Sequence, residues 1–176
     1  MTRNMTLLLS AGFMLLVSQF SAAEMTVSFE GNLVNPGCHL SDDSTRKEVV
    51  LPEQRFSELE YQGRSEPYFF QLEILDCSKN ILNKTVKMTF SSNTTEKHNG
   101  IYYLKTAGST NLLLALTDHQ GKEIALNSAI DTQKITETGK GSINIVSLGV
   151  YAQKPFNTSL YAGDFSAMLT FNLDYQ

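Results

Sequence analysis

Hydrophobic and polar residues alternate at the C-terminal end of this chain. Between residues 165 and 176 the even-numbered positions are mostly polar, and only Met168 breaks that rule. The odd-numbered positions are apolar: Phe165, Ala167, Leu169, Phe171, Leu173 and Tyr175. This period of two predicts a β-strand with one buried face, and such a strand needs neighbours along its hydrogen-bonding edges.

A second alternating segment lies near the N-terminus. In EMTVSFEGNLV (24–34) the even-numbered positions from 24 to 32 are polar. The odd-numbered positions form the other face: Met25, Val27, Phe29, Gly31 and Leu33. The pattern predicts a second strand with one apolar face, similar in length to the C-terminal one. Ordinary edge strands are short, bulged or charged on both faces, which avoids recruiting another chain, so this long strand is expected to recruit one.

The segments between these two strands also have the composition of β-structure. Short apolar stretches separated by polar turns lie at 49–51, 68–77, 85–90, 111–126 and 141–152, with a turn expected at 118–121. Residues 53–66 are polar and are expected to form a loop or a short helical turn. No window keeps a 3.6-residue period long enough for a main helix. The pattern predicts an all-β, immunoglobulin-like sandwich of roughly six to eight strands, with a barrel as the alternative.

The first 23 residues have the composition of an export signal. Arg3 precedes an apolar run from Leu7 to Val17, and small residues at 21–23 come just before Glu24. The run is shorter than the roughly 20 residues that a membrane-spanning helix needs, so a cleaved signal peptide is favoured over a retained membrane anchor. No later segment is long and apolar enough to cross a membrane as a helix.

Charge and cysteine content narrow the function classes of the exported chain. The sequence has 14 basic and 18 acidic residues, and the leader contributes only Arg3, which leaves 13 basic residues against 18. This acidic balance offers no obvious basic patch for nucleic acid or an anionic membrane surface. Cys38 and Cys77 are expected to form one disulfide in an oxidising compartment, which would contribute roughly 3–4 kcal/mol. Free or metal-bound thiols are the alternative.

No stretch carries a recognised catalytic or cofactor-binding motif. The segment at 139–142 lacks the spacing of a phosphate-binding loop, and we interpret it as a β-turn. The three histidines show no metal-ligand spacing. Asp42 and Asp43 are adjacent in a polar segment that is typical of a loop, and His119 lies in an expected turn. We therefore expect no enzyme activity, cofactor or metal site; a small exported enzyme using Asp42, Asp43 or His119 is the alternative.

Together, these features resemble the subunits of chaperone–usher fimbriae, the pilins of type 1 and P pili. The resemblance rests on the segment SFEGNLVNPGC (28–38), the two cysteines, the ALTDHQG turn (115–121), and a closing strand in which Gly163 is fourteenth from the end and Tyr175 is next to last. It extends over essentially the whole chain after the leader. The FEGNL and Cys38-His39 context is closer to the tip and adaptor subunits of P-type pili than to the rod subunit.

The resemblance implies a fold and a mode of assembly. Pilins have an incomplete immunoglobulin-like sandwich, the pilin fold lacking its last strand, so a groove lies open beside the C-terminal strand. The N-terminal extension of another subunit fills that groove, which is a known example of β-strand addition. The donor side chains would be Met25, Val27, Phe29, Gly31 and Leu33. The acceptor and chaperone-binding strand would contribute Gly163, Phe165, Ala167, Leu169, Phe171, Leu173 and Tyr175.

The resemblance also implies partners and a location. A periplasmic pilus chaperone would lend a strand to the groove and hold the C-terminal carboxylate with basic residues. At the outer-membrane usher, neighbouring pilin subunits would then replace the chaperone. The expected organisation is a signal peptide at 1–23, a donor-strand extension at 24–34 and a pilin domain at 35–176. The protein would be a structural subunit, a minor or adaptor pilin of a cell-surface fimbrium involved in assembly and cell adhesion.

Two alternatives remain beside donor-strand exchange. Asn35-Pro36-Gly37 is a turn signal, so residues 24–34 folding back onto their own domain would give a self-completed monomer. We favour exchange between subunits because of the family resemblance. The alternative function is a tip module that binds a glycan directly, but the exported chain is too short for a separate lectin domain and has no tryptophan to stack on a sugar.

Overall fold

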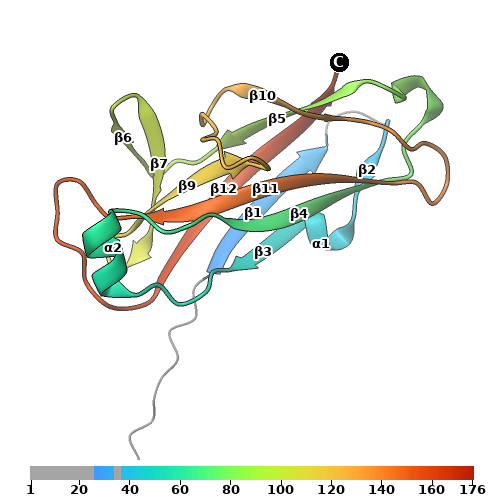
Figure 1. The fold of residues 1–176 in the computed structure, drawn as a ribbon. Helices are drawn as coiled ribbons and strands as arrows, with labels where there is room; N and C mark the ends of the chain where they lie inside the picture. Colours follow the sequence, from blue (N-terminus) through green and yellow to red (C-terminus); the bar gives the residue numbers. More distant parts are fainter. Residues whose placement is uncertain (1–25, 34–36) are drawn as a thin grey trace, which may run out of the picture.

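Two β-sheets pack face to face in the computed structural model, which describes residues 26–33 and 37–176 (Figure 1). The first sheet has the strand order β10-β5-β12-β1-β3, and β8 pairs with β12 beside that path. Its strands are β1 (Thr26–Leu33), β3 (Arg46–Val50), β5 (Thr85–Ser91), β8 (Ala107–Gly108), β10 (Ala129–Lys134) and β12 (Phe165–Tyr175).

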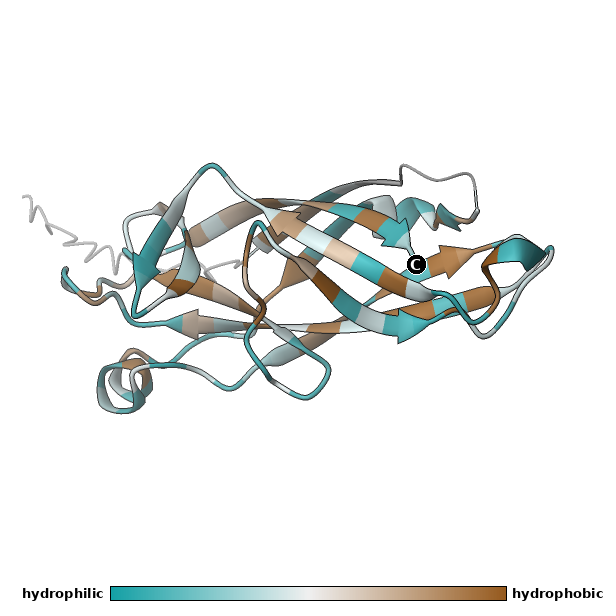
Figure 2. Cartoon of the chain, turned by 90° about the horizontal axis from the view of Figure 1, so that it is seen from above, coloured by the Kyte–Doolittle hydropathy of each residue, from teal (hydrophilic) through white to brown (hydrophobic). Residues whose placement is uncertain are grey.

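The second sheet has the strand order β2-β4-β11-β9-β7-β6. Its long strand β11 pairs antiparallel with β4 on one side and with β9 on the other. Figure 2 shows hydrophobic and hydrophilic residues alternating along strands, which gives a strand one apolar face. The strands of this sheet are β2 (His39–Leu40), β4 (Tyr68–Leu75), β6 (Thr95–His98), β7 (Ile101–Lys105), β9 (Leu113–Asp118) and β11 (Ile143–Gln153).

The inward faces of the two sheets form one main hydrophobic core. The ring centroids of Phe29 on β1 and Phe70 on β4 lie 4.6 Å apart, so aromatic packing joins the sheets directly. Phe90 on β5 and Phe171 on β12 are both fully buried in the same core, with centroids 6.2 Å apart. The prediction of an all-β sandwich is therefore confirmed, and the barrel alternative is not.

Most of the predicted strands are present, but a hairpin was missed. The turn predicted at 118–121 is confirmed, because the Asp118 carboxylate accepts a hydrogen bond from the Gln120 N–H. β6 and β7 form an antiparallel hairpin that turns at Asn99 and Gly100, both of which have positive φ. The polar sequence of β6 gives no alternating signal, so it was not predicted. The described residues hold twelve strands, more than the predicted six to eight.

Two short α-helices connect strands in the described part of the chain. α2 (Phe56–Gln62) lies within 53–66, where the sequence predicts a loop or a helical turn, and it ends at the left-handed Gly63. α1 (Asp42–Thr45) replaces a predicted polar loop. The Ser41 hydroxyl accepts a hydrogen bond from a backbone N–H of this helix, so the serine that favours a loop here serves as a helix cap.

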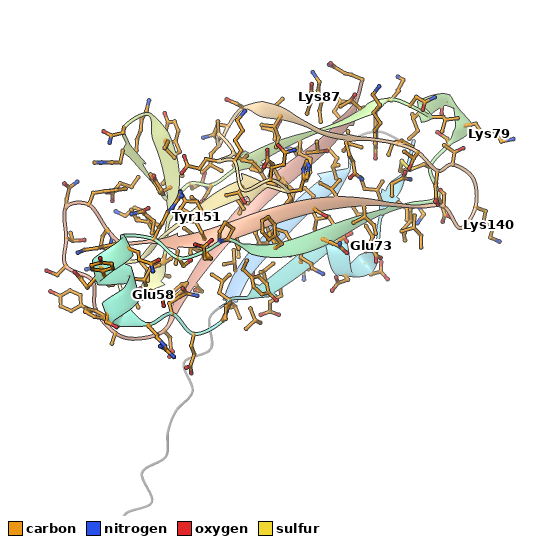
Figure 3. All side chains as sticks on the ribbon, in the orientation of Figure 1. Glu58, Glu73, Lys79, Lys87, Lys140 and Tyr151 are labelled. Atoms are coloured by element: carbon orange, nitrogen blue, oxygen red, sulfur yellow. A yellow bond between two sulfur atoms is a disulfide. The ribbon has the colours of Figure 1, made fainter. Side chains whose placement is uncertain are left out.

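The predicted disulfide between Cys38 and Cys77 is present, and both cysteines are buried. It links the start of β2 to the end of β4, next to the short 3-10 helix η1 (Lys79–Ile81). Lys79 and Lys140 are labelled at this end of the molecule in Figure 3, and Glu58 of α2 is labelled at the other. The disulfide therefore anchors the chain directly after the N-terminal strand.

Asn144 is a buried polar residue that holds the loop before β11 in place. Its side-chain oxygen accepts hydrogen bonds from the backbone N–H groups of Thr136, at 2.9 Å, and Glu137, at 3.1 Å. Its amide nitrogen donates to the Glu137 carbonyl at 2.9 Å. Because Asn144 is only 3% exposed, these backbone groups depend on it for their hydrogen bonds.

We expect replacement of both Cys38 and Cys77 by alanine to lower the free energy of unfolding by about 2–5 kcal/mol, because the unfolded chain gains freedom. Urea titration followed by circular dichroism measures this change. The wild-type protein in excess reductant is the control and should unfold at a similar midpoint. An unchanged midpoint in the double variant would contradict the expectation.

We expect Asn144→Ala to lower the free energy of unfolding by about 1–3 kcal/mol, because two backbone donors lose their acceptor in a buried site. Asn172→Ala is the matched control, since Asn172 is exposed on β12. Urea titration of both variants tests this. Equal effects of the two substitutions would show that the buried hydrogen bonds do not stabilise the fold.

Candidate functional site: the β3–β12 groove

The candidate site is the space between β3 and β12 that β1 occupies, named here the β3–β12 groove. β1 runs parallel to β12, in a continuous register from Thr26 opposite Ser166 to Leu33 opposite Leu173. On its other edge β1 runs antiparallel to β3. Figure 1 shows β1 between these two strands. Among the described residues, β1 is the strand that joins β3 to the rest of its sheet.

This arrangement is the self-completed one, the alternative to exchange between subunits. In the single chain, the groove beside β12 is filled by the chain's own N-terminal segment, and not by a strand from another molecule. Without β1, residues 37–176 would leave β12 and β3 unpaired along the edges that now pair with β1. Residues 37–176 therefore correspond to the incomplete sandwich that the resemblance implies, and β1 is the strand that completes it.

The predicted donor side chains of β1 point into the core where the structure describes them. Val27 and Phe29 are both 0% exposed. Burying apolar side chains of this size is worth about 1.5–3 kcal/mol each. The register places Leu33 opposite Leu173, and Met25 lies outside the described residues. Val27 and Phe29 are therefore part of the hydrophobic core.

Gly31 is the predicted donor residue beside which the groove has no room for a side chain. A Cβ atom at Gly31 would lie 2.2–2.5 Å from ring atoms of Phe171, its register partner on β12. The pairing of β1 with β12 continues through Gly31 without a bulge. Gly31 thus allows close approach of the Phe171 ring, and this contact favours one register of β1 over its neighbours.

β12 supplies the predicted wall of the groove. Ala167 is partly buried and packs against the core, whereas Gly163 precedes the strand. Met168, the exception to the alternation, is 59% exposed on the outer face. The remaining predicted wall residues are all buried: Phe165, Leu169, Phe171, Leu173 and Tyr175.

Tyr175 stands at the far end of this wall with a polar group in the core. Its hydroxyl is buried and has no hydrogen-bond partner among the described residues. Burial, with a smaller contribution from the neighbouring Asp174 carboxylate, raises the pKa of Tyr175 to about 12. A tyrosine is neutral at physiological pH even at its ordinary pKa of 10.0, and burial in the apolar groove disfavours the charged form further.

An open, mostly apolar pocket lies near the end of the groove at which the described part of β1 begins. It has a volume of about 180 Å³ and is lined by Leu59, Leu112, Leu160, Gly163 and Phe165, among others. Phe165 is one residue before Ser166, the partner of Thr26, so the pocket begins where the described part of β1 does. The pocket is thus an open hollow beside Phe165, at the Thr26 end of the described strand.

The residues of the enzyme alternative are not brought together. Asp42 and Asp43 open α1, where Asp43 pairs with Lys47, and His119 lies in the turn after β9. Within residues 26–33 and 37–176, no group of three or more His, Cys, Asp or Glu side chains is placed to hold a metal ion. No helix in that part of the chain has both the length and the apolar character needed to cross a membrane.

Sequence reasoning missed the second wall of the groove. β3 pairs with β1 from Arg46 opposite Glu30 to Val50 opposite Thr26. The sequence signal there was a three-residue apolar run at 49–51, which located the strand but not its partner. Phe70, which packs on Phe29, was within a predicted strand but was not recognised as part of the site.

Comparison with known proteins gives the family. Residues 27–176 match the family model described as "Fimbrial protein". The fimbrial adapter PapK of Escherichia coli is 29% identical over 95% of this chain and 98% of its own length. The major MR/P fimbria protein of Proteus mirabilis is 28% identical, with 98% of each chain covered.

Solved structures agree on the fold. The P pilus rod subunit PapA matches with a TM-score of 0.60 at 23% identity, over 80% of this chain and 99% of that one. A subunit in the structure of a chaperone–usher pilus matches with a TM-score of 0.65 at 24% identity, over 84% of this chain and 93% of that one. The resemblance inferred from the sequence is thereby confirmed: the chain belongs to the fimbrial protein family, the pilins of chaperone–usher pili.

Proposed function

We propose that this protein is a pilus subunit that joins its neighbours by donor-strand exchange. In this proposal β1 leaves its own groove and completes the sheet of an adjacent subunit, and the vacated groove accepts a strand from the next one. The observation that supports it best is the position of β1, which pairs along both edges and contributes Val27 and Phe29 to the core. The family consists of structural subunits, so an enzyme function is not retained.

Exchange between subunits has a small energetic cost because β1 would make the same contacts in another copy as in its own domain. A second copy of this chain has the same β3–β12 groove, so β1 would bury the same apolar side chains there as in its own groove. Domain swapping has a low cost for this reason. β1 is connected to the disulfide-anchored Cys38 through residues 34–37, which would form the link between the donated strand and its own domain.

We also propose that a periplasmic chaperone holds the subunit before an outer-membrane usher incorporates it into the surface fimbrium. The end of β12 suits such a chaperone. Gln176 exchanges two backbone hydrogen bonds with Thr85, at 2.6 and 3.0 Å, while its side chain remains exposed. The C-terminal residue is thus held at the end of the sheet, where a basic partner can reach its carboxylate.

Within the pilus, we propose the role of a minor or adaptor pilin that contributes to assembly and cell adhesion. The support is the FEGNL segment and the Cys38-His39 context, together with the name of PapK, a fimbrial adapter. No feature of the described residues favours the alternative of a tip module that binds a glycan directly.

Deletion of residues 24–33 should leave the β3–β12 groove empty, and we expect the purified exported chain to aggregate or lose its native fold. Adding a synthetic peptide of residues 24–34 should restore a monomer, because the peptide supplies the missing strand. Size-exclusion chromatography with light scattering measures the outcome. A peptide with Phe29→Asp is the control and should not restore the fold.

The wild-type exported chain should in addition form linear polymers whose assembly stops when residues 24–33 are absent. Electron microscopy of the two preparations gives the readout. Stable monomers from both chains, with no need for peptide or chaperone, would contradict the proposed function.

Substitution of Gly31 tests the register of β1 against β12, in which Gly31 lies opposite Phe171. We expect Gly31→Leu to lower the free energy of unfolding by about 1–3 kcal/mol, because the leucine side chain would overlap the Phe171 ring. The effect should shrink in a Phe171→Ala background, where space is available. Ser28→Leu on the outer face is the control. Equal destabilisation by Gly31→Leu with and without Phe171 would count against the register.

A further inference from the structure

The outer face of β1 carries a pattern of charge that the apolar inner face does not explain. Glu30 lies opposite Arg46 on β3, and Ser28 lies opposite Glu48. Glu30, Arg46 and Glu48 are all exposed, so these side chains contribute nothing to the core. β3 therefore presents one positive and one negative side chain along the outer edge of the inserted strand.

Two outer positions of β1, Ser28 and Glu30, suit the charge that faces them, whereas Thr26 lies opposite the uncharged Val50. Glu30 is the register partner of Arg46, although the two side chains form no close ion pair among the described residues; facing side chains of opposite charge on neighbouring strands attract each other. Ser28 is uncharged, so it avoids the repulsion that an acidic residue would meet opposite Glu48. On the other edge, the register partner of Ser28 is Met168, the exposed methionine that interrupts the polar face of β12.

Neighbouring charges do not alter this pairing. Lys47, between Arg46 and Glu48, is opposite the inward Phe29 and pairs with Asp43 of α1. A shallow surface hollow runs along the same row of residues and is lined by Ser28, Glu30 and Arg46, among others. The charges of β3 thus border the inserted strand on the side that stays open to solvent.

We propose that Arg46 and Glu48 make β3 a charge-selective wall that discriminates among the strands seated in the β3–β12 groove. This inference rests on the proposed function and deepens it. The preferred occupant is an extended strand that presents an acidic side chain opposite Arg46 and a neutral or basic one opposite Glu48. The chain's own β1 meets both conditions.

The same wall selects the direction of the strand. An alternating strand presents an apolar face whichever way it runs, so inward side chains such as Val27 and Phe29 discriminate weakly between directions. If β1 ran antiparallel to β12 with Gly31 still opposite Phe171, Glu30 would move to the row of Asn172, away from Arg46. The alignment of Glu30 with Arg46 is therefore specific to the parallel seating seen in the single chain.

A charge-reversal cycle on the exported chain in its monomeric state tests this inference. We expect Glu30→Lys and Arg46→Glu each to raise the unfolding equilibrium constant by about two- to fivefold, and the double variant to recover the loss. The recovery should vanish in about 1 M NaCl, where exposed charges are screened beyond about 3 Å. Amide hydrogen exchange of β1 should follow the same order.

Lys140→Glu is the matched control, because it makes the same charge change in the loop before β11, which belongs to the other sheet. Combined with Glu30→Lys, it should give additive effects. Additive effects for Glu30→Lys with Arg46→Glu, or a recovery that is equal in high salt, would overturn the charge-selective wall.

The charge-reversal cycle is measured on monomers, and polymerisation is measured in a separate experiment. A failure of the charge-selective wall can therefore be distinguished from a failure of donor-strand exchange. A lost recovery with normal polymers would overturn charge selection alone. A clear recovery without any polymer would support selection of β1 by its own groove and contradict donor-strand exchange.

Discussion

The structure depends on the insertion of β1 between β12 and β3. Among the residues that the structure describes, these two strands are joined in one sheet through β1 alone, which pairs with both of them. The same insertion closes the core, because Phe29 packs against Phe70 of the opposite sheet. A strand of eight residues thus satisfies two rows of backbone hydrogen bonds and excludes water from the centre of the sandwich.

The two faces of β1 serve different purposes in this insertion. The inner face supplies apolar burial, and Gly31 beneath Phe171 restricts the register. The outer face lies beside the charged residues of β3, and in the proposal above these charges select the direction and the sequence of the strand in the groove. A pilus subunit needs both, since affinity alone would let any alternating strand occupy the groove. Burial holds a strand in place, and the outer row distinguishes one strand from another.

The sequence predicted the elements of the groove better than their arrangement. β1 and β12 were recognised because both alternate over their whole length, and the disulfide followed from two cysteines in an exported chain. The contact between Gly31 and Phe171 could not be predicted, because it depends on a register between segments about 140 residues apart. The direction of β1 was also hidden, since a period of two reads the same both ways.

Polar elements were the other gap between sequence and structure. β6 and β10 are mostly polar, and Ile130 of β10 is the one residue of theirs that packs against the main core, so alternation gives no signal for them. α1 forms where serine and aspartate favour a loop, because Ser41 caps the helix and the Ser44 hydroxyl accepts a hydrogen bond from the Glu73 N–H of β4. Tertiary contacts therefore decided these segments, and local propensity did not.

The most direct test of the account is to determine which chain supplies the strand in each groove of an assembled polymer. Isotopically labelled and unlabelled subunits can be mixed, assembled and studied by solid-state NMR filtered for contacts between chains. The account predicts contacts of the Phe29 ring with core residues of a different chain. Contacts of Phe29 confined to its own chain throughout the polymer would contradict it.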